Sequence, residues 1–121
     1  MSIPLLICDD SSMARKQVAR SLPEDWDVVI EFATNGKEGI EAIRQGKGEM
    51  VFLDLTMPEM DGYDVLKAIK EEQLKSVVIV ISGDIQPEAR ERVMKFGALE
   101  FIKKPISKEK LEKVLQQYGL I

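Results

Sequence analysis

The chain contains no histidine among its 121 residues. Histidine is the side chain that most often acts as a general base near neutral pH, and it is a frequent zinc ligand. Its absence excludes serine-type catalytic triads and most zinc sites. Any catalysis must therefore come from carboxylates, hydroxyls, lysine or a bound metal ion.

Cysteine is almost as scarce, because Cys8 is the single one in the chain and no internal disulfide can form. It lies in the apolar run of residues 5–8, which predicts a buried thiol in a reducing compartment. The N-terminus lacks a basic region followed by a long apolar stretch, and no apolar run approaches the roughly 20 residues that cross a bilayer. We therefore expect a cytoplasmic protein without a membrane partner.

Clustered basic residues are also missing, since the formal net charge is -4 and the Lys and Arg residues are scattered. Nucleic-acid-binding domains concentrate positive charge on one face, so we expect no direct binding of nucleic acid. A magnesium ion or a basic partner surface fits the charge better. The length and the 45% hydrophobic content predict a single globular domain over residues 1–121.

Short apolar runs alternate with amphipathic segments along the whole chain. The runs predict five strands, at residues 5–8, 28–33, 50–53, 77–81 and 100–103. Helical patterns follow each of them over short connections. Five strands alternating with five helices predict an α/β fold, in which a doubly wound parallel sheet carries helices on both faces.

Capping and breaking residues set the expected helix ends. The first helix carries Ala14, Val18 and Leu22 at fourfold spacing and is expected to stop at Pro23. Asp61 is a candidate N-cap of the third helix, and Pro87 suits the first turn of the fourth.

In a parallel sheet of this kind ligands bind at the carboxyl ends of the strands. The residues at those ends are Asp9 and Asp10, Asp54, Ser82 and Lys104, in the order of the first, third, fourth and fifth strands. Two carboxylates about 4 Å apart repel by roughly 4 kcal/mol at an effective dielectric constant of about 20. A hard divalent cation resolves that repulsion, and Mg²⁺ favours carboxylates, a carbonyl and retained waters.

With a metal bound, Asp54 stays ionised and can attack phosphorus as a nucleophile. A lysine and a hydroxyl at the same edge can contact the remaining phosphoryl oxygens. Lys104 and Ser82 are of these types. The strand-end residues together thus predict phosphoryl chemistry at Asp54.

This set resembles the receiver domain of two-component response regulators, of the chemotaxis protein Y type, over essentially the whole chain. Met57-Pro58 and Asp61-Gly62 match the family's turn after the phosphoacceptor. The resemblance implies a flavodoxin-like sheet with strand order 2-1-3-4-5. It also implies a signalling protein that is switched by phosphorylation and catalyses only its own phosphoryl transfer and dephosphorylation.

The resemblance assigns roles to the strand-end residues. Asp54 would take the phosphoryl group from a phosphohistidine of a sensor histidine kinase, or from a phosphotransfer protein. Asp10 and Asp54 would hold Mg²⁺ with the backbone carbonyl of Thr56, and Asp9 would act largely through bound water. Lys104 would pair with the phosphoryl oxygens, and its peptide bond to the following proline is usually cis in the family.

Two further positions match the family's switch residues. Ser82 is the switch hydroxyl, and Phe101 occupies the switch aromatic position. The resemblance implies that they alter the surface of the fourth helix, fifth strand and fifth helix. That surface would control a downstream protein target, or an effector domain beyond residue 121.

Three alternative classes of protein predict different residues at these positions. A pseudo-receiver that is never phosphorylated would be expected to lack the acceptor, one of the acid pair or the lysine, and this chain has all of them. An aspartate-nucleophile phosphatase carries its nucleophile on the first strand with a second Asp two residues on, where Asp54 is followed by Thr56. A flavodoxin would need a hydroxyl-rich phosphate loop in place of Asp9 and Asp10.

Overall fold

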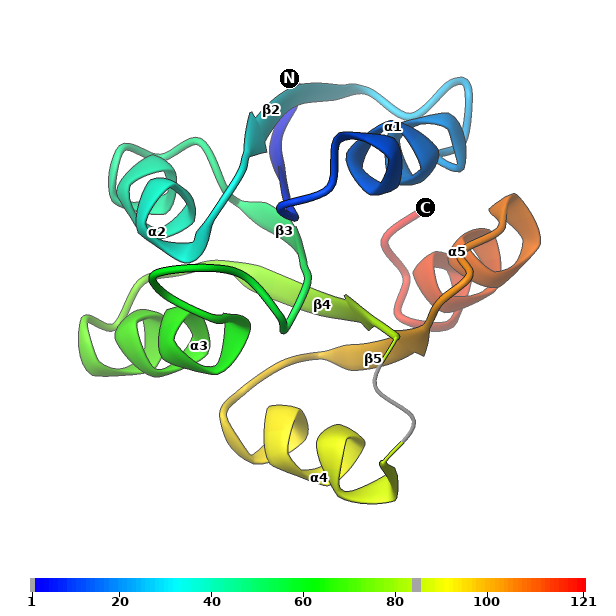
Figure 1. Ribbon diagram of the computed structural model, residues 1–121. Coiled ribbons are helices and arrows are strands. Elements are labelled where there is room, and N and C mark those ends of the chain that lie inside the picture. Colours follow the sequence, from blue (N-terminus) through cyan, green and yellow to red (C-terminus); the bar gives the residue numbers. More distant parts are fainter. Residues whose placement is uncertain (1, 84–85) are drawn as a thin grey trace.

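The computed structural model describes residues 2–83 and 86–121, and its strands form one parallel sheet in the order β2-β1-β3-β4-β5 (Figure 1). Every neighbouring pair is parallel. The predicted doubly wound α/β fold and its strand order are confirmed. The strands are β1 (Ile3–Cys8), β2 (Val28–Ala33), β3 (Met50–Leu53), β4 (Val77–Ser82) and β5 (Glu100–Lys103).

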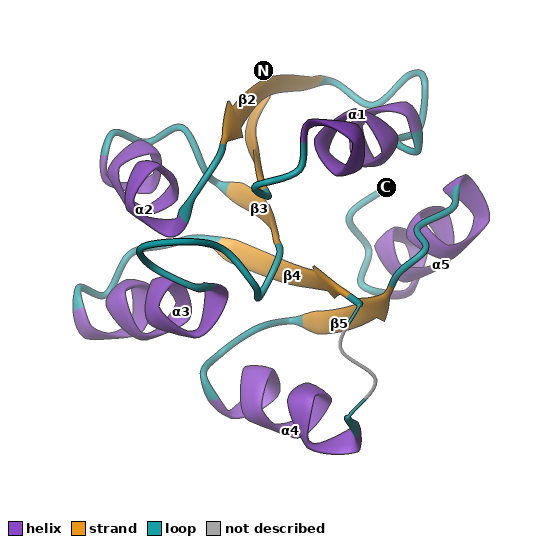
Figure 2. Ribbon diagram, in the orientation of Figure 1, coloured by secondary structure: helices purple, strands orange, loops and turns teal. Residues whose placement is uncertain are grey.

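Helices cover both faces of the sheet, with α1 and α5 on one face and α2, α3 and α4 on the other (Figure 2). Each face has its own apolar core, because successive strand residues point to opposite sides. Leu6, Val51 and Val80 pack toward α2, α3 and α4, whereas Leu5, Phe52 and Ile79 pack toward α1 and α5. The helices are α1 (Ser12–Arg20), α2 (Gly36–Arg44), α3 (Gly62–Glu71), α4 (Pro87–Lys95) and α5 (Lys108–Gln117).

Burial follows the position of each strand in the sheet. All four residues of β3 are buried, as expected for an unbroken apolar run in the middle of a parallel sheet. In the described part of the chain β2 pairs only with β1, so it forms one edge of the sheet. Val29 and Phe32 on that edge are about half exposed.

The first helix ends earlier than predicted, at Arg20 rather than at Pro23. Pro23 disfavours the helical conformation of Leu22, which is nevertheless buried beyond the helix end. The Ser21 hydroxyl donates a 2.7 Å hydrogen bond to the Gln17 carbonyl and satisfies one of the last helical acceptors. The other expected ends agree closely, and Asp61 caps α3 in a capping box.

Within residues 2–83 and 86–121 there is no helix with the length and apolar character that a membrane span requires.

Candidate functional site

The backbone ladder of the sheet continues past the ends of the strands and fixes the residues that follow them. The amide of Asp54 donates to the carbonyl of Cys8 over 2.9 Å, and the amide of Lys104 donates to the carbonyl of Ser82 over 2.8 Å. Asp9 is held in the same way by β2. The charged side chains are thus mounted on rigid backbone at one edge of the sheet.

Three carboxylates meet at this edge, as predicted. Oxygen atoms of Asp9, Asp10 and Asp54 all lie within 4.8 Å of one another. Ligand oxygens on opposite sides of a Mg²⁺ ion lie about 4.2 Å apart, since each metal–oxygen bond is about 2.1 Å. Three carboxylate oxygens at separations of this order are a donor set that fits a hard divalent cation. Asp9 and Asp54 are buried and Asp10 is exposed, so the ion would retain water on its open side.

Lys104 lies between two of the acids. Its ammonium nitrogen is 3.0 Å from Oδ2 of Asp9 and 3.5 Å from Oδ1 of Asp54. The other oxygen of Asp9 accepts a 2.9 Å hydrogen bond from the amide of Ser11. Both oxygens of Asp9 therefore have protein partners.

The ionisation of the site follows from burial and charge. The pKa of Asp54 is raised from 3.8 to about 6, mainly because the carboxyl is buried and next because Asp9 is negative, while Lys104 counteracts part of the rise. Burial alone would lower the pKa of Lys104, but its hydrogen bond to Asp9 and the charge of Asp54 raise the pKa more. At neutral pH the site thus holds an ionised Asp54 beside a protonated lysine.

An open hollow of about 470 Å³ exposes these groups to solvent and collects most of the predicted residues. Its lining is Asp10, Asp54, Thr56, Ser82, Gly83 and Lys104. The peptide bond from Lys104 to Pro105 is cis, as the resemblance implied. Phe101 does not line the hollow; it is half-buried on β5 and packs against the core beneath α4.

One contact at the site could not be predicted from the sequence. A guanidinium nitrogen of Arg15, in α1, donates a 2.7 Å hydrogen bond to the carbonyl of Asp9 and so braces the peptide between the two acids. Arg15 is one of several basic residues on an amphipathic helix, and no pattern distinguishes it. Behind the acids, Cys8 is buried as predicted, and burial raises the pKa of its thiol to about 12.

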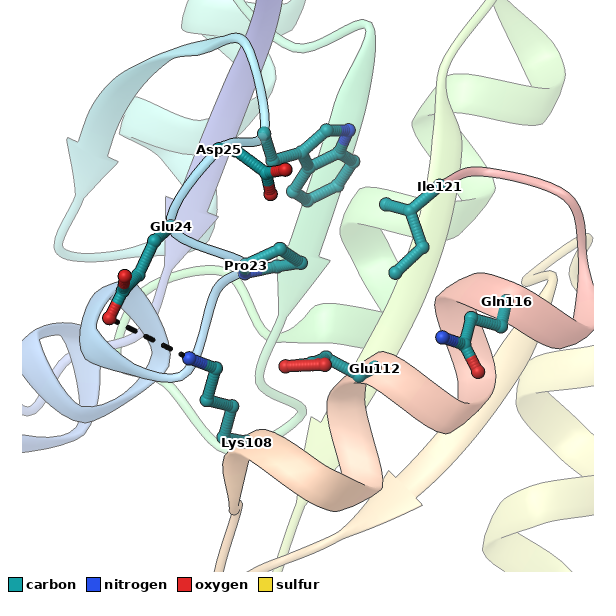
Figure 3. Close-up of a pocket in the computed structure, with 8 residues that line it drawn as sticks. Pro23, Glu24, Asp25, Lys108, Glu112, Gln116 and Ile121 are labelled. Atoms are coloured by element: carbon teal, nitrogen blue, oxygen red, sulfur yellow. Dashed lines mark ion pairs between the residues drawn. The ribbon is translucent and has the colours of Figure 1, made fainter.

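A second hollow, of about 760 Å³, shares none of its lining residues with the acidic one. It lies between the segment that follows α1 and the helix α5 (Figure 3). Figure 3 shows Glu24 reaching toward Lys108, with 3.8 Å between the charged atoms. Trp26 is part of this wall, remote from the carboxylates.

Comparison with known proteins agrees with this geometry. Residues 5–116 match the family described as response regulator receiver domain. A curated relative, protein-glutamate methylesterase/protein-glutamine glutaminase 1 of Oleidesulfovibrio alaskensis, is 37% identical over 95% of this chain and 33% of its own length. The chain thus spans about a third of the length of such relatives.

Solved structures show the same fold. The response regulator domain of Thermotoga maritima CheB superposes with a TM-score of 0.79 at 28% identity, with 98% of both chains covered. A chain from the CheX-CheY-BeF3-Mg+2 complex of Borrelia burgdorferi gives a TM-score of 0.86 at 29% identity, covering 95% of this chain and 87% of that one.

Proposed function

The chain belongs to the response regulator receiver domain family, and from this premise we propose that it is a phosphoacceptor switch of a two-component phosphorelay. Asp54 takes a phosphoryl group from a phosphohistidine of a sensor histidine kinase or a phosphotransfer protein. The reaction depends on Mg²⁺ and takes place in the cytoplasm. The protein catalyses only its own phosphoryl transfer and dephosphorylation.

The observation that carries the proposal is the placement of Asp54, a buried strand-end carboxylate between two acids and 3.5 Å from the Lys104 ammonium. An oxygen of Asp54 attacks phosphorus, the bond from phosphorus to the histidine nitrogen breaks, and the imidazole leaves as the neutral group after protonation. The product is an acyl phosphate on Asp54. Lys104 can turn from the carboxylates to the new phosphoryl oxygens, because it already lies beside them.

The metal site is proposed on the same carboxylates. Asp10, Asp54 and the carbonyl of Thr56 would hold Mg²⁺, with Asp9 contributing through bound water. When bound, the ion neutralises charge on the carboxylates and on the transferred phosphoryl group. Lys104 is not a ligand in this arrangement.

We propose that Ser82 and Phe101 carry the signal outward. Ser82 lines the same hollow as Asp54, and its hydroxyl is of the type that can bond to a phosphoryl oxygen. Phe101 lies on the neighbouring strand, paired with Val80, two residues before Ser82. A movement at Ser82 would let the Phe101 ring move inward and change the surface of α4, β5 and α5. A downstream protein, or an effector domain beyond residue 121, reads that change as a population shift.

The proposal is tested by incubating the protein with acetyl phosphate and measuring intact mass. We expect one phosphoryl group on the wild type with Mg²⁺, none in chelator, and none on Asp54→Asn. Asp25→Asn, which removes a carboxylate from the second hollow, is the matched control and should label as wild type does. Equal labelling of Asp54→Asn would show that the acceptor lies elsewhere.

A further inference from the structure

Glu100, the first residue of β5, is a buried carboxylate that the proposed chemistry does not use, and its side chain has partners on three elements. The residue is only 6% exposed. The Tyr118 hydroxyl donates to its Oε2 over 2.7 Å, and the amide of Phe101 donates to its Oε1 over 3.1 Å. Both terminal nitrogens of Arg90 also donate to it, one over 3.3 Å and one closer. We call Arg90, Glu100 and Tyr118 the Glu100 cluster.

The Glu100 cluster wraps around the open edge of the sheet. In the described residues β5 pairs only with β4. Ile102 packs in the core beneath α5, and Glu100, two residues earlier, lies on the same face of the strand. Ala89 and Val93 pack α4 against the opposite face, and Figure 1 shows α4 and α5 on opposite sides of the sheet. The contact between Arg90 and Glu100 therefore passes around the edge of β5.

The pairing resists separation because the carboxylate is buried and charged. Burial alone would raise the pKa of Glu100, but the hydrogen bonds from Arg90 and Tyr118 lower it more, and the pKa is lowered on balance. A buried carboxylate that loses a partner is left with an uncompensated charge. The cluster therefore ties α4 and α5 to β5 in the arrangement observed.

The position of Arg90 connects this tie to the phosphorylation site. Arg90 lies in the first turn of α4, which begins at Pro87. Phe101, whose amide donates to Glu100, packs against the core beneath α4. The proposed inward movement of the Phe101 ring would therefore move the first turn of α4 relative to β5. Such a movement stretches the contact between Arg90 and Glu100.

We infer that Glu100 is a positioning residue that holds α4 against the displacement that phosphorylation requires. This inference rests on the proposed function. Opening the Glu100 cluster then costs free energy, and this cost weakens the binding of a phosphoryl group at Asp54. Weakening the cluster should raise the population of the binding-competent arrangement and tighten the binding of a phosphoryl analogue.

The test titrates beryllium fluoride into the full chain with saturating Mg²⁺ and measures the Kd by calorimetry. Arg90→Gln should bind at least about fivefold more tightly than wild type, the lower end of ordinary allosteric coupling. Tyr118→Phe, which removes one oxygen, should shift the Kd in the same direction by less. Arg90→Lys keeps the charge and should return toward wild type.

Arg44→Gln is the matched control. It removes another bidentate ion pair, in which two nitrogens of Arg44 donate to the two carboxylate oxygens of Glu72 over 2.8 and 2.7 Å. This pair joins α2 to the end of α3 and does not involve α4. The Kd of this variant should equal that of wild type. That result would show that the loss of a surface ion pair does not by itself tighten the binding of beryllium fluoride.

An unchanged or weaker Kd in folded Arg90→Gln would overturn the inference. Arg90 is 55% exposed in its side chain, so this variant is expected to fold. Should its amide spectrum show that it does not, an unchanged Kd in Tyr118→Phe overturns the inference instead. A wild type that fails to bind beryllium fluoride with Mg²⁺ would contradict the proposed function itself.

Discussion

The ammonium nitrogen of Lys104 lies 3.0 Å from Oδ2 of Asp9, and this pair joins the ends of β5 and β1 across the acidic hollow. Lys104 is also within 3.5 Å of Asp54. One lysine thus compensates two buried carboxylates, and the third acid, Asp10, remains exposed to solvent. Lys104 and a bound metal ion would each neutralise part of the negative charge of these carboxylates.

The variant Lys104→Ala distinguishes the role of the lysine from that of the metal ion. Mg²⁺ affinity should be kept or raised, because a competing cation has been removed and no ligand has been lost. Phosphorylation by acetyl phosphate should slow by tenfold or more, since about 1.4 kcal/mol of lost transition-state stabilisation gives that factor. Calorimetric titration with Mg²⁺ and time-resolved intact mass measure the two effects. A loss of Mg²⁺ affinity would mean that Lys104 organises the ligands.

Asp54→Asn should stabilise the metal-free protein. Burial raises the pKa of Asp54 from 3.8 to about 6 in the folded protein, so the folded state binds the proton more tightly than the unfolded chain does. Through Asp54 the wild type therefore loses folding free energy as pH rises from about 4 to about 6, and the loss is complete above that range. In chelator at about pH 7.5 the variant should gain on the order of 1 kcal/mol, less than the full shift implies, because the hollow is open to solvent.

Thermal unfolding at several pH values checks this expectation. The gain should vanish near pH 4, where Asp54 is protonated in wild type. It should also shrink in saturating Mg²⁺, because the intact site gains more from the ion. A constant difference across pH and metal would show that the acids do not repel one another.

Ser82→Ala and Phe101→Ala should leave phosphorylation intact and interrupt the signal. Both variants should gain a phosphoryl group from acetyl phosphate. On addition of beryllium fluoride and Mg²⁺, the amide resonances of α4, β5 and α5 should move much less than in wild type, because the route from Asp54 is cut. Wild-type shifts in both variants would place the route elsewhere.

The fluorescence of Trp26 should be nearly insensitive to metal binding at Asp54. Trp26 lies in the wall of the second hollow, which shares no lining residue with the first. Its fluorescence should hardly respond to Mg²⁺ in a titration that calorimetry shows to reach saturation. A strong quench on metal addition would reveal a structural link between the two hollows.

Gly62→Ala should destabilise the loop that carries Asp54. A Cβ at residue 62 would sit 2.4 Å from the Asp54 carbonyl oxygen and 2.8 Å from the Leu55 Cα, both on the backbone. Relief of such overpacking costs about 1–3 kcal/mol. The midpoint of urea unfolding should fall accordingly. Gly83→Ala, where a Cβ meets no atom of the described residues within 4 Å, is the control and should change the midpoint little.

Sequence reasoning predicted the sheet because its strands are unbroken apolar runs, and such runs identify buried parallel strands. It also predicted which side chains gather at one edge, since parallel strands end together. It could not predict how those side chains pair. The contact between Asp9 and Lys104 joins residues 95 positions apart, and three acids at one edge offered the lysine several choices.

The Glu100 cluster was missed for a related reason. Glu100 begins a strand and appears in the sequence as an ordinary polar flank of an apolar run. Its carboxylate contacts Arg90 of α4 and Tyr118, the residue that follows α5, and these two helices lie on opposite faces of the sheet. Only the tertiary arrangement brings these partners around an open strand edge, and no local pattern encodes it.

The register between β1 and β3 has one further consequence. Cys8 is paired with Leu53, so Asp9 and Asp54 occupy the next rung on adjacent strands. The gap between their backbones is then the ordinary spacing of neighbouring strands, about 4.8 Å, which belongs to the peptide hydrogen bonds and not to any side chain. Apolar residues beneath the site can be exchanged for others of similar volume while this pairing is kept. The backbones of the two acids then keep the same spacing, so the chemistry of this edge does not depend on the particular apolar residues of the core.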